Sequence, residues 1–519
     1  MLDFIIHKKS ILLSVLSGVL VVFAFPNFNV WPLAWVALIP MFFALKNKNL
    51  KQTFVLGLIF GLVANLGFLR WLPFSVFNIS NSLLPGIEVW IIAVIYPAVS
   101  IGIFFLLYSF IQKNLTGKKK RLWNDLLGII SIPAIWVVLE FVQYLLFQGF
   151  PFTYDFLGHT QWNNVRIIQV SAFTGVFGVS FLVVLVNLCL YRLWENRKAK
   201  EAIFGIVIFA VCLFYGVWII DFKAPKISEN KANMVKAVIL DGDIDSRVKW
   251  QNKEKVANFI SGTYLDLNKK AVAENPNLIV WTETAIPWAI EGGDDLVEAS
   301  LKITNPTGAF HLIGMPSYAN SEKSKYFNSA LFFSPAGLML DRYDKFHLMT
   351  FFETGRKIGA INVGNANSRY VQGEKNKLLN TPLGKIAVII CNENLYQDYA
   401  RRIVNKGAEF IVSIGNDSLL ANDTIISQHF AVNYFRAVEN RRDIIVANND
   451  GISGAVDAFG RTITVSSENN SHIIPTTIEK RNQKSFYTAY GDVFSYFCVL
   501  CGLLGVILSF IPSTIEITQ

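Results

Sequence analysis

The sequence predicts a polytopic α-helical membrane bundle of about eight spans that carries a soluble α/β domain. Of the 519 residues, 52% are hydrophobic and 16% are charged, whereas about 25% of the residues in an ordinary soluble domain are charged. Several apolar stretches reach the ~20 residues that a helix needs to cross a bilayer. One long segment, residues 222–491, has ordinary charge and only short apolar runs such as VKAVIL and KIAVII. We therefore expect a membrane protein with one large domain outside the bilayer.

Eight apolar stretches are candidate membrane spans. They lie near residues 10–25, 31–45, 53–73, 88–112, 123–147, 167–191, 202–220 and 493–511. Their order predicts a membrane domain of seven spans at 1–221, the soluble domain at 222–491, and a last span with a short tail at 492–519. The segment FAFPNFNVWPLAW follows the first stretch without a small-residue cleavage pattern, so we expect this stretch to be retained rather than removed as a signal peptide.

Basic residues mark every second connection between these spans. They are Lys8 and Lys9 before the first span, then Lys46, Lys48 and Lys51, then Lys113, Lys118, Lys119, Lys120 and Arg121, then Arg192, Arg197, Lys198 and Lys200. The connections 26–31, 74–87 and 149–165 contain no Lys or Arg. Because short cytoplasmic loops are enriched in Lys and Arg, we predict cytoplasmic termini and a soluble domain outside the cytoplasm. This topology also explains the net charge of +9, so we expect no nucleic-acid partner.

One cysteine is set apart from the others. Four of the five lie in or beside apolar spans: Cys189, Cys212, Cys498 and Cys501. Cys391 is alone in the soluble domain, and a lone cysteine is most often a small buried hydrophobe. The run KIAVIICNENLYQDYARRIV, however, predicts a buried strand, a turn at Cys391 and a helix from about Leu395. A thiol at such a turn lies near helix N-terminal amides, which stabilise a thiolate and can donate to an oxyanion.

Two charged residues complete a mechanistic set with this thiol. Glu283 follows the short apolar strand of NLIVWTETAIPW, and Lys345 lies in DRYDKFHLMTFFE. Each charge alone is typical of a solvated surface. Together with Cys391 they can perform acyl transfer, because a carboxylate can take the thiol proton, the thiolate can attack an acyl carbon, and the ammonium can stabilise the oxyanion.

The order Glu283, Lys345, Cys391 resembles the Glu-Lys-Cys triad of the nitrilase superfamily. Lys345 lies 62 residues after Glu283 and 46 residues before Cys391, which is similar to the spacing in that superfamily. Seven spans before the domain and one after it resemble the apolipoprotein N-acyltransferase family, as do the segments FAFPNFNVWPLAW, LEFVQYLLFQGFPF, VKW, WTETAIP, GNDSLLAND, QHFAVNYFRAVENRR, NNDGISG and FYTAYGD. The resemblance extends over nearly the whole chain. It implies that the soluble domain is an αββα sandwich.

The sequence departs from the pattern of this family at four positions. An aromatic residue is usual where Asn392 and Leu419 stand, and Arg and Tyr are usual where Gln143 and His159 stand. None of the four belongs to the triad. We therefore expect the departures to affect substrate binding and loops rather than the chemistry.

The resemblance implies a phospholipid:apolipoprotein N-acyltransferase of the bacterial inner membrane with its catalytic domain on the periplasmic side. A phospholipid would donate the acyl chain, and the α-amino group of the diacylglyceryl-cysteine of an apolipoprotein would receive it, as the last step of lipoprotein maturation. The closest alternative is a membrane-anchored carbon-nitrogen hydrolase or amidase that uses the same triad and passes the acyl group to water. A transporter or a silent lipoprotein-binding protein would have several charges inside its spans, where we find chiefly Glu140.

By the same resemblance, each residue of the triad has an expected role. Glu283 would be the general base, Cys391 the nucleophile that carries the acyl group as a thioester, and Lys345 the cation that stabilises the oxyanion. The backbone amide of Asn392 would help Lys345. The kinetics should be ping-pong.

Three further residues are candidates for supporting the triad. Glu353 and Glu393 are expected to orient or neutralise Lys345, because an unpaired ammonium in a largely dry site is costly. Trp250 is a candidate contact for lipid or for a mobile loop, with a core aromatic as the equal alternative.

No metal or cofactor is expected. The soluble domain contains His347 and His429, but neither has a second His at the spacing of metal ligands, and we expect both to be structural. The sequence also contains no Gly-rich phosphate loop, no Cys pair suited to zinc and no dinucleotide fingerprint.

Overall fold

The computed structural model describes residues 7–80, 83–115, 122–147, 153–195, 199–224, 231–245, 253–289, 293–349, 353–354, 356–358, 361–363, 368–418, 420, 422–466 and 470–511. The chain divides into two compact units. The first consists of Met1–Phe74, Leu83–Phe222 and Asp492–Gln519, and the second of Ser75–Ser82 and Lys223–Gly491. In the described residues the first unit is helical, and the second contains both helices and sheets.

Six helices of the described first unit are long and apolar enough to cross a bilayer. They are α3 (Leu50–Phe68), α5 (Leu83–Asn114), α6 (Leu122–Leu146), α8 (Val176–Trp194), α9 (Ala199–Val217) with the π-helical turn η5 (Trp218–Lys223), and α15 (Val493–Phe510). Helix α1 (Lys8–Ala24) occupies the first expected span and has 17 residues. The protein is therefore a membrane protein, while the count of eight spans stays a prediction.

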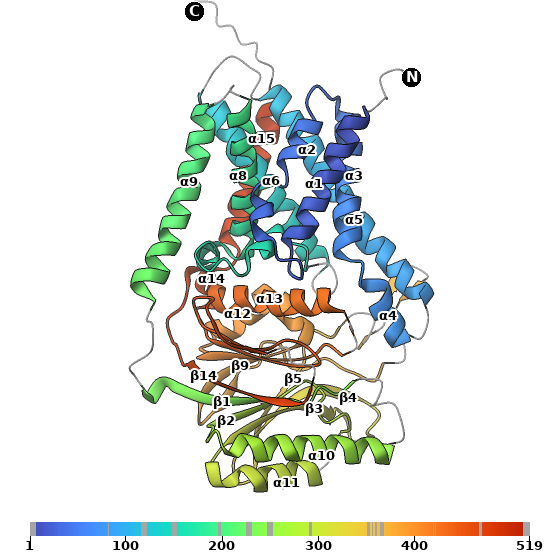
Figure 1. Ribbon diagram of the computed structural model, residues 1–519, viewed down its shortest axis with the longest axis vertical. Coiled ribbons are helices and arrows are strands. Elements are labelled where there is room, and N and C mark those ends of the chain that lie inside the picture. The colour runs from blue at the N-terminus through green and yellow to red at the C-terminus, as the bar shows by residue number, and fades with distance from the viewer. Residues whose placement is uncertain are drawn as a thin grey trace, which may run out of the picture. The chain divides into compact units, whose positions relative to one another are not determined.

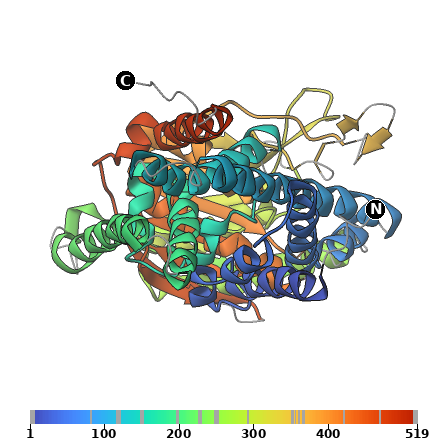
Figure 2. The same cartoon turned by 90° about the horizontal axis from the view of Figure 1, so that it is seen from above.

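The helices of this unit differ in how much of their surface other residues cover. In α8, 83% of the apolar stretch is buried, compared with 11% in α9. Figure 2 shows α8 among the other helices and α9 at one side of them. Helix α9 therefore presents most of its apolar surface outward, as a helix in contact with lipid does.

The second expected span is not a regular helix. The 3₁₀-helix η2 (Trp31–Trp35) and the short helix α2 (Ile39–Ala44) take its place. Such a break frees backbone groups that cannot bond to water inside a membrane. The side chain of Asn187 in α8 supplies partners, because its amide donates to the Ala34 carbonyl at 2.7 Å and its oxygen accepts from the Leu38 amide at 2.9 Å. Sequence periodicity could not predict the break, since both pieces are apolar.

Contacts between loops agree with the alternation of basic and non-basic connections. Lys46, which follows the second expected span, forms a 3.0 Å ion pair with Glu195, which follows the sixth. A second ion pair, at 3.1 Å, joins Arg166 to Asp221. These two residues flank connections that are expected on the other side of the membrane. Each pair joins segments that the sequence places on the same side of the bundle.

Two six-stranded sheets form the centre of the second unit. In spatial order the first sheet contains β14 (His472–Glu479), β1 (Met234–Asp241), β2 (Leu278–Trp281), β3 (Phe310–Tyr318), β4 (Tyr326–Phe333) and β5 (Met339–Asp344). The second contains β13 (Thr462–Ser466), β12 (Ser453–Val456), β11 (Ile444–Asn449), β10 (Phe410–Asn416), β9 (Gly384–Ile390) and β8 (Leu379–Thr381). A small hairpin pairs β6 (Arg356–Ile358) with β7 (Ile361–Val363).

Helices cover the outer faces of both sheets (Figure 1). Helices α10 (Lys253–Val272) and α11 (Asp295–Thr304) lie on the first sheet, and α12 (Gln397–Asn405) and α13 (Asp423–Asn440) lie on the second. The unit is therefore the αββα sandwich that the resemblance implied. The sequence also predicts helical stretches at 251–270 and 424–441, and these correspond to α10 and α13.

The burial of β2 explains why the strands of the first sheet are apolar runs in the sequence. Every residue of β2 is buried. Trp281 at its end stacks on Tyr264 of α10, with ring centroids 4.4 Å apart and planes 5° from parallel. Strands covered on both faces are expected to be apolar throughout rather than alternating.

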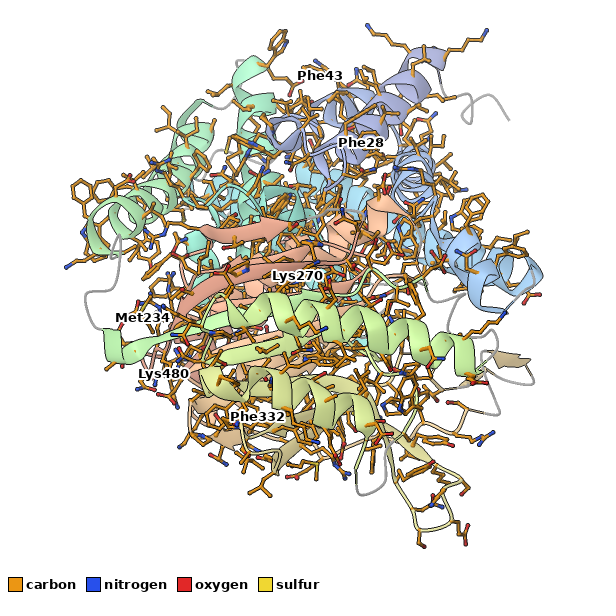
Figure 3. The ribbon with its side chains drawn as sticks, turned by 60° about the horizontal axis from the view of Figure 1, so that its bottom comes forward. Phe28, Phe43, Met234, Lys270, Phe332 and Lys480 are labelled. Atoms are coloured by element: carbon orange, nitrogen blue, oxygen red, sulfur yellow. The ribbon has the colours of Figure 1, made fainter. Side chains whose placement is uncertain are left out.

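The two ends of the second unit lie together. Strand β1 pairs antiparallel with β14, so that Met234 is opposite Glu479. Figure 3 shows Met234 beside Lys480, whose amide donates to the Asn233 carbonyl at 2.8 Å. A domain whose first and last strands are neighbours can be inserted between two membrane segments without separating its ends.

Candidate active site

Glu283 lies just past the end of β2, where the backbone is tightly constrained. Its amide donates to the Gly415 carbonyl at the end of β10, at 3.3 Å. The next residue, Thr284, has a left-handed φ of 46°. Gly314 of β3 allows this turn, because a Cβ there would lie 2.1 Å from the Thr282 carbonyl oxygen. The backbone at Glu283 is therefore held by strands of both sheets, and its side chain is buried.

Cys391 lies at the corresponding position of the second sheet. It follows β9 directly and begins the 3₁₀-helix η9 (Cys391–Leu395), after which α12 begins at Gln397. The expected helix thus begins two residues later than predicted, after a tighter turn. Cys391 has a φ of 54°, a conformation that costs a non-glycine residue roughly 1–3 kcal/mol and is found mainly at functional sites.

Lys345 follows β5 and is 1% exposed. Its ammonium lies 2.8 Å from Glu353 Oε2 and 3.4 Å from Glu283 Oε1. Burial disfavours the charged ammonium, but Glu353 and Glu283 outweigh it and raise the pKa of Lys345 well above its usual value. Lys345 is therefore a fixed positive charge in a dry site.

The thiol of Cys391 experiences opposing effects. Burial raises its pKa well above the usual value, and the charge of Glu283 raises it further, while Lys345 lowers it. The resting side chain is thus a protonated thiol, and a base has to remove its proton before it can attack. The structure brings Glu283, Lys345 and Cys391 together at one site, as their order in the sequence predicted.

Glu353 forms the other side of the Lys345 ion-pair cluster. Its Oε2 also accepts from the Met349 amide at 2.8 Å. Its Oε1 accepts from the side-chain amide of Asn328 at 2.7 Å, and the same amide nitrogen donates to Glu283 Oε1 at 2.7 Å. Sequence reasoning missed Asn328, although a polar residue inside the apolar strand YFNSALFF was a usable signal.

Glu393 lies apart from the Lys345 ion pairs. Its carboxylate accepts from the backbone amides of Phe346, His347 and Ile390 at 2.8–3.0 Å. The hydroxyl of Tyr343 donates to it as well, at 2.7 Å. Burial raises the pKa of Glu393 to about 7, against the amides and the hydroxyl, which favour the carboxylate. Glu393 therefore joins the segment after β5 to the turn after β9. The charge of Lys345 also lowers the pKa of Glu393, and that Glu393 orients or neutralises Lys345 stays a prediction.

Asn392 is buried beside the nucleophile. Its side-chain amide donates to the His347 carbonyl at 3.3 Å, across the same two segments. Asn392 therefore contributes to loop packing in addition to any use of its backbone amide. Trp250 and Leu419 lie outside the described residues.

The two histidines that the sequence analysis singled out are packed against neighbouring side chains near the site. The ring of His347 stacks on Tyr396 with centroids 3.8 Å apart, and burial lowers its pKa to about 4. His429 Nδ1 lies 2.8 Å from Asp417 Oδ1, and both side chains are buried. Burial lowers the pKa of His429, but the effect of Asp417 is larger, so the pKa is raised overall.

Among the described residues, no group of three or more His, Cys, Asp or Glu side chains is arranged to hold a metal ion. The chemistry available is that of a buried carboxylate, a thiol and a fixed ammonium. A carboxylate next to a thiol can take and return its proton, and an ammonium can stabilise an oxyanion. This arrangement suits covalent acyl transfer.

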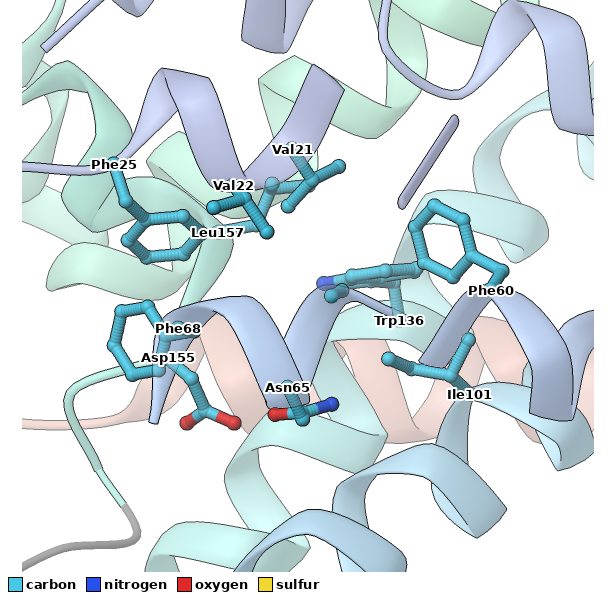
Figure 4. A pocket seen from close by; sticks show the side chains of 11 residues that line it. Val21, Val22, Phe25, Phe60, Asn65, Phe68, Ile101, Trp136, Asp155 and Leu157 are labelled. Carbon is cyan, nitrogen blue, oxygen red and sulfur yellow. The ribbon is translucent and has the colours of Figure 1, made fainter. Parts of the chain in front are cut away.

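The helical unit contains a separate, mostly apolar pocket (Figure 4). It is lined mostly by aliphatic and aromatic side chains of α1, α3, α5 and α6, with Asn65 and Asp155 as its polar members. Gln143 donates to Asp155 at 2.8 Å. His159, in the same connection as Asp155, lies against the Tyr154 carbonyl at 3.1 Å. Gln143 and His159 thus each bond to the segment just before η3 (Leu157–Gln161).

Comparison with known proteins covers both units. Residues 17–189 match the model of the apolipoprotein N-acyltransferase N-terminal domain, and residues 241–483 match that of carbon-nitrogen hydrolases. An apolipoprotein N-acyltransferase of Geobacter metallireducens is 30% identical over 522 residues, covering 97% of this chain and 96% of the relative. One of Thermotoga maritima is 26% identical over 513 residues, covering 96% and 94%. The crystal structure of Saccharomyces cerevisiae Nit3, of the nitrilase superfamily, aligns with 51% of this chain and 97% of its own, at 17% identity and a TM-score of 0.39.

Proposed function

The chain belongs to the apolipoprotein N-acyltransferase family, and we propose that it moves an acyl chain from a membrane phospholipid, through a thioester on Cys391, to the α-amino group of a diacylated apolipoprotein. It is a membrane-bound N-acyltransferase with a lipid donor and a lipoprotein acceptor. The observation that carries the detailed proposal is the buried Lys345 paired with Glu283 and Glu353 beside a protonated Cys391 thiol.

In the first half-reaction Glu283 takes the proton of Cys391, and the thiolate attacks the carbonyl carbon of the phospholipid ester. The ammonium of Lys345, with the backbone amide of Asn392, stabilises the oxyanion that forms. When the tetrahedral intermediate collapses, the C–O bond breaks, Glu283 returns the proton to the departing oxygen, and lysophospholipid leaves. Cys391 then carries the acyl chain as a thioester.

In the second half-reaction the amine of the apolipoprotein attacks the thioester. Glu283 takes the proton that the nitrogen loses, the C–S bond breaks, and the proton returns to the sulfur of Cys391. The product is an amide, and the enzyme recovers its resting thiol. No cofactor enters either step.

The arrangement of the chain suits substrates that are lipids. We propose that residues 1–221 and 492–519 form the membrane domain and that residues 222–491 form the catalytic domain on the periplasmic side of the inner membrane. The basic connections support this orientation. Glu353 and Glu393 support the active site, the first by pairing with Lys345 and the second by fixing the backbone beside the nucleophile. Trp250 stays a candidate for contact with lipid.

The test is transfer in proteoliposomes that contain phosphatidylethanolamine. A diacylated lipopeptide with a free N-terminal amine should gain one acyl chain, measured by mass spectrometry. The same lipopeptide with an acetylated amine is the matched control and should gain none. Release of fatty acid at the same rate with and without an acceptor, and no acylated lipopeptide, would show instead a hydrolase that uses the same triad.

A further inference from the structure

We infer that Asn328 is a positioning residue of this acyl transfer, which bridges the two carboxylates that pair with Lys345, those of Glu283 and Glu353, and so fixes the orientation of the Glu283 carboxylate. The inference rests on the proposed function, because it assigns a task to Asn328 within that reaction. Asn328 lies in β4 and is 2% exposed.

The two protons of the Asn328 amide go to different carboxylates. One donates to Glu283 Oε1 and the other to Glu353 Oε1, each at 2.7 Å. Both partners only accept when ionised, so the nitrogen of the amide has to face them. Asn328 Oδ1 consequently faces elsewhere, and it is buried without a hydrogen-bond partner among the described residues. An unmet buried acceptor is unfavourable, so the side chain is held for its donors.

The charges in the cluster explain why a neutral double donor is needed. Glu283 and Glu353 share the single ammonium of Lys345. Two carboxylates around one cation repel each other, and such pairs tend to share a proton. A second cation would neutralise the general base, whereas an amide satisfies both carboxylates without adding charge.

The same geometry divides the two oxygens of Glu283. Oε1 accepts from Asn328 at 2.7 Å and lies 3.4 Å from the ammonium of Lys345. Among the described residues, no hydrogen bond is found to Oε2. With Oε1 held, Oε2 is the oxygen left to exchange a proton with Cys391 and with the attacking amine.

Replacement of the side chain leaves the local backbone link in place. The carbonyl of Asn328 accepts from the amide of Lys345 at 2.8 Å, and any residue at this position can make that bond. Asn328→Asp has the same shape but loses both donors and, when ionised, adds a third carboxylate to the cluster. The matched control is Asn268→Asp in α10, because Asn268 is also buried, donates to the Tyr264 carbonyl at 2.7 Å and has an unpartnered Oδ1 among the described residues.

The experiment measures acylation of the full-length enzyme by phosphatidylethanolamine in a single turnover, by intact mass. Asn328→Asp should slow acylation about 100-fold or more, because it removes two bonds to charged groups and adds a negative charge beside the base. The loss should appear in the rate constant at saturating lipid and leave the apparent KM for lipid within about threefold. Asn268→Asp should lower the melting temperature but leave the rate constant of acylation within about threefold of wild type. Asn328→Ser, which keeps one donor, should fall between wild type and Asn328→Asp, and it provides the test if the latter does not fold.

Two results would overturn the inference. One is acylation by Asn328→Asp or Asn328→Ser within about threefold of wild type. The other is a rate loss that parallels the loss of thermal stability in both the Asn328 and the Asn268 variants. If wild type itself forms no acyl-enzyme, the proposed function fails instead, so the two failures are distinct.

Discussion

At the scale of single residues, the chemistry depends on a thiol that is protonated at rest. Burial and Glu283 raise the pKa of Cys391, and Lys345 lowers it. Because these effects oppose each other, a substitution can make the thiol more reactive toward an alkylating reagent and still abolish acyl transfer. A residue that raises the thiol pKa can still be essential to the reaction.

We predict opposite effects of Glu283→Gln and Lys345→Met on alkylation of Cys391 by iodoacetamide. Loss of the Glu283 charge lowers the thiol pKa, so the pH profile of alkylation should move to lower pH. Loss of the Lys345 charge should move it to higher pH. Both variants should lose acyl transfer. Peptide mass spectrometry after alkylation measures the first effect, with Cys391→Ala as the control for the other cysteines, and shifts in the same direction for both variants would contradict the assignment.

We predict that Glu393→Gln lowers both stability and acylation. A glutamine has one acceptor oxygen, whereas the Glu393 carboxylate accepts from three backbone amides and the Tyr343 hydroxyl. The loss of unfolding free energy should be about 2–4 kcal/mol, as expected when bonds to a buried charged acceptor are lost. Thermal unfolding and single-turnover acylation measure the two effects. Full stability with slow acylation would indicate instead that Glu393 acts on Lys345.

Sequence reasoning placed Glu283, Lys345 and Cys391 in one set because strand ends carry a visible signal. Glu283 and Cys391 each follow an apolar run, and the structure places both at strand ends. It did not reach Asn328, because the partners of a side chain in the middle of a strand depend on the register of neighbouring strands. That Glu393 orients or neutralises Lys345 stays a prediction. Spacing along the chain could not show that its hydrogen bonds go to backbone amides and to the Tyr343 hydroxyl.

At the scale of elements, the alternation of buried strands with helices agrees with α/β layering, while the αββα arrangement itself was implied by the family resemblance. Helices α10 and α13 begin and end within two residues of the patterns at 251–270 and 424–441. The turn after β9 was predicted, but its 3₁₀ geometry was not, because the left-handed conformation of Cys391 is imposed by contacts rather than by local preference. The break between η2 and α2 was missed for a similar reason, since its partner Asn187 is distant in sequence.

We predict that Asn187→Leu destabilises the membrane unit by about 1–3 kcal/mol. The substitution removes the acceptor for the Leu38 amide and the donor to the Ala34 carbonyl, and water cannot replace them in the apolar bundle. Thermal unfolding in detergent measures the change. Leu190→Ala, on a more exposed part of the same helix, is the control and should cost less. Equal losses for the two variants would show that the hydrogen bonds of Asn187 are not needed.

At the scale of the whole molecule, the account assigns a side of the membrane to each segment. We predict that a reporter active only in the periplasm is functional when inserted in the 222–491 segment and silent when fused after residue 519. The reporter should also be functional when it is fused in the connection 74–87. It should be silent when it is fused in the connection 113–121. Activity at position 519 together with silence in the 222–491 segment would reverse the assigned orientation.

The central claim is that a thioester on Cys391 links a lipid donor to an amine acceptor, and intact mass of the full-length enzyme tests it most directly. After incubation with phosphatidylethanolamine, wild type should gain one acyl chain, and hydroxylamine should remove it. Cys391→Ala should gain none, and a diacylated lipopeptide with a free amine should discharge the adduct and appear with one more acyl chain. No adduct on wild type under these conditions, or an adduct that Cys391→Ala also forms, would contradict the account.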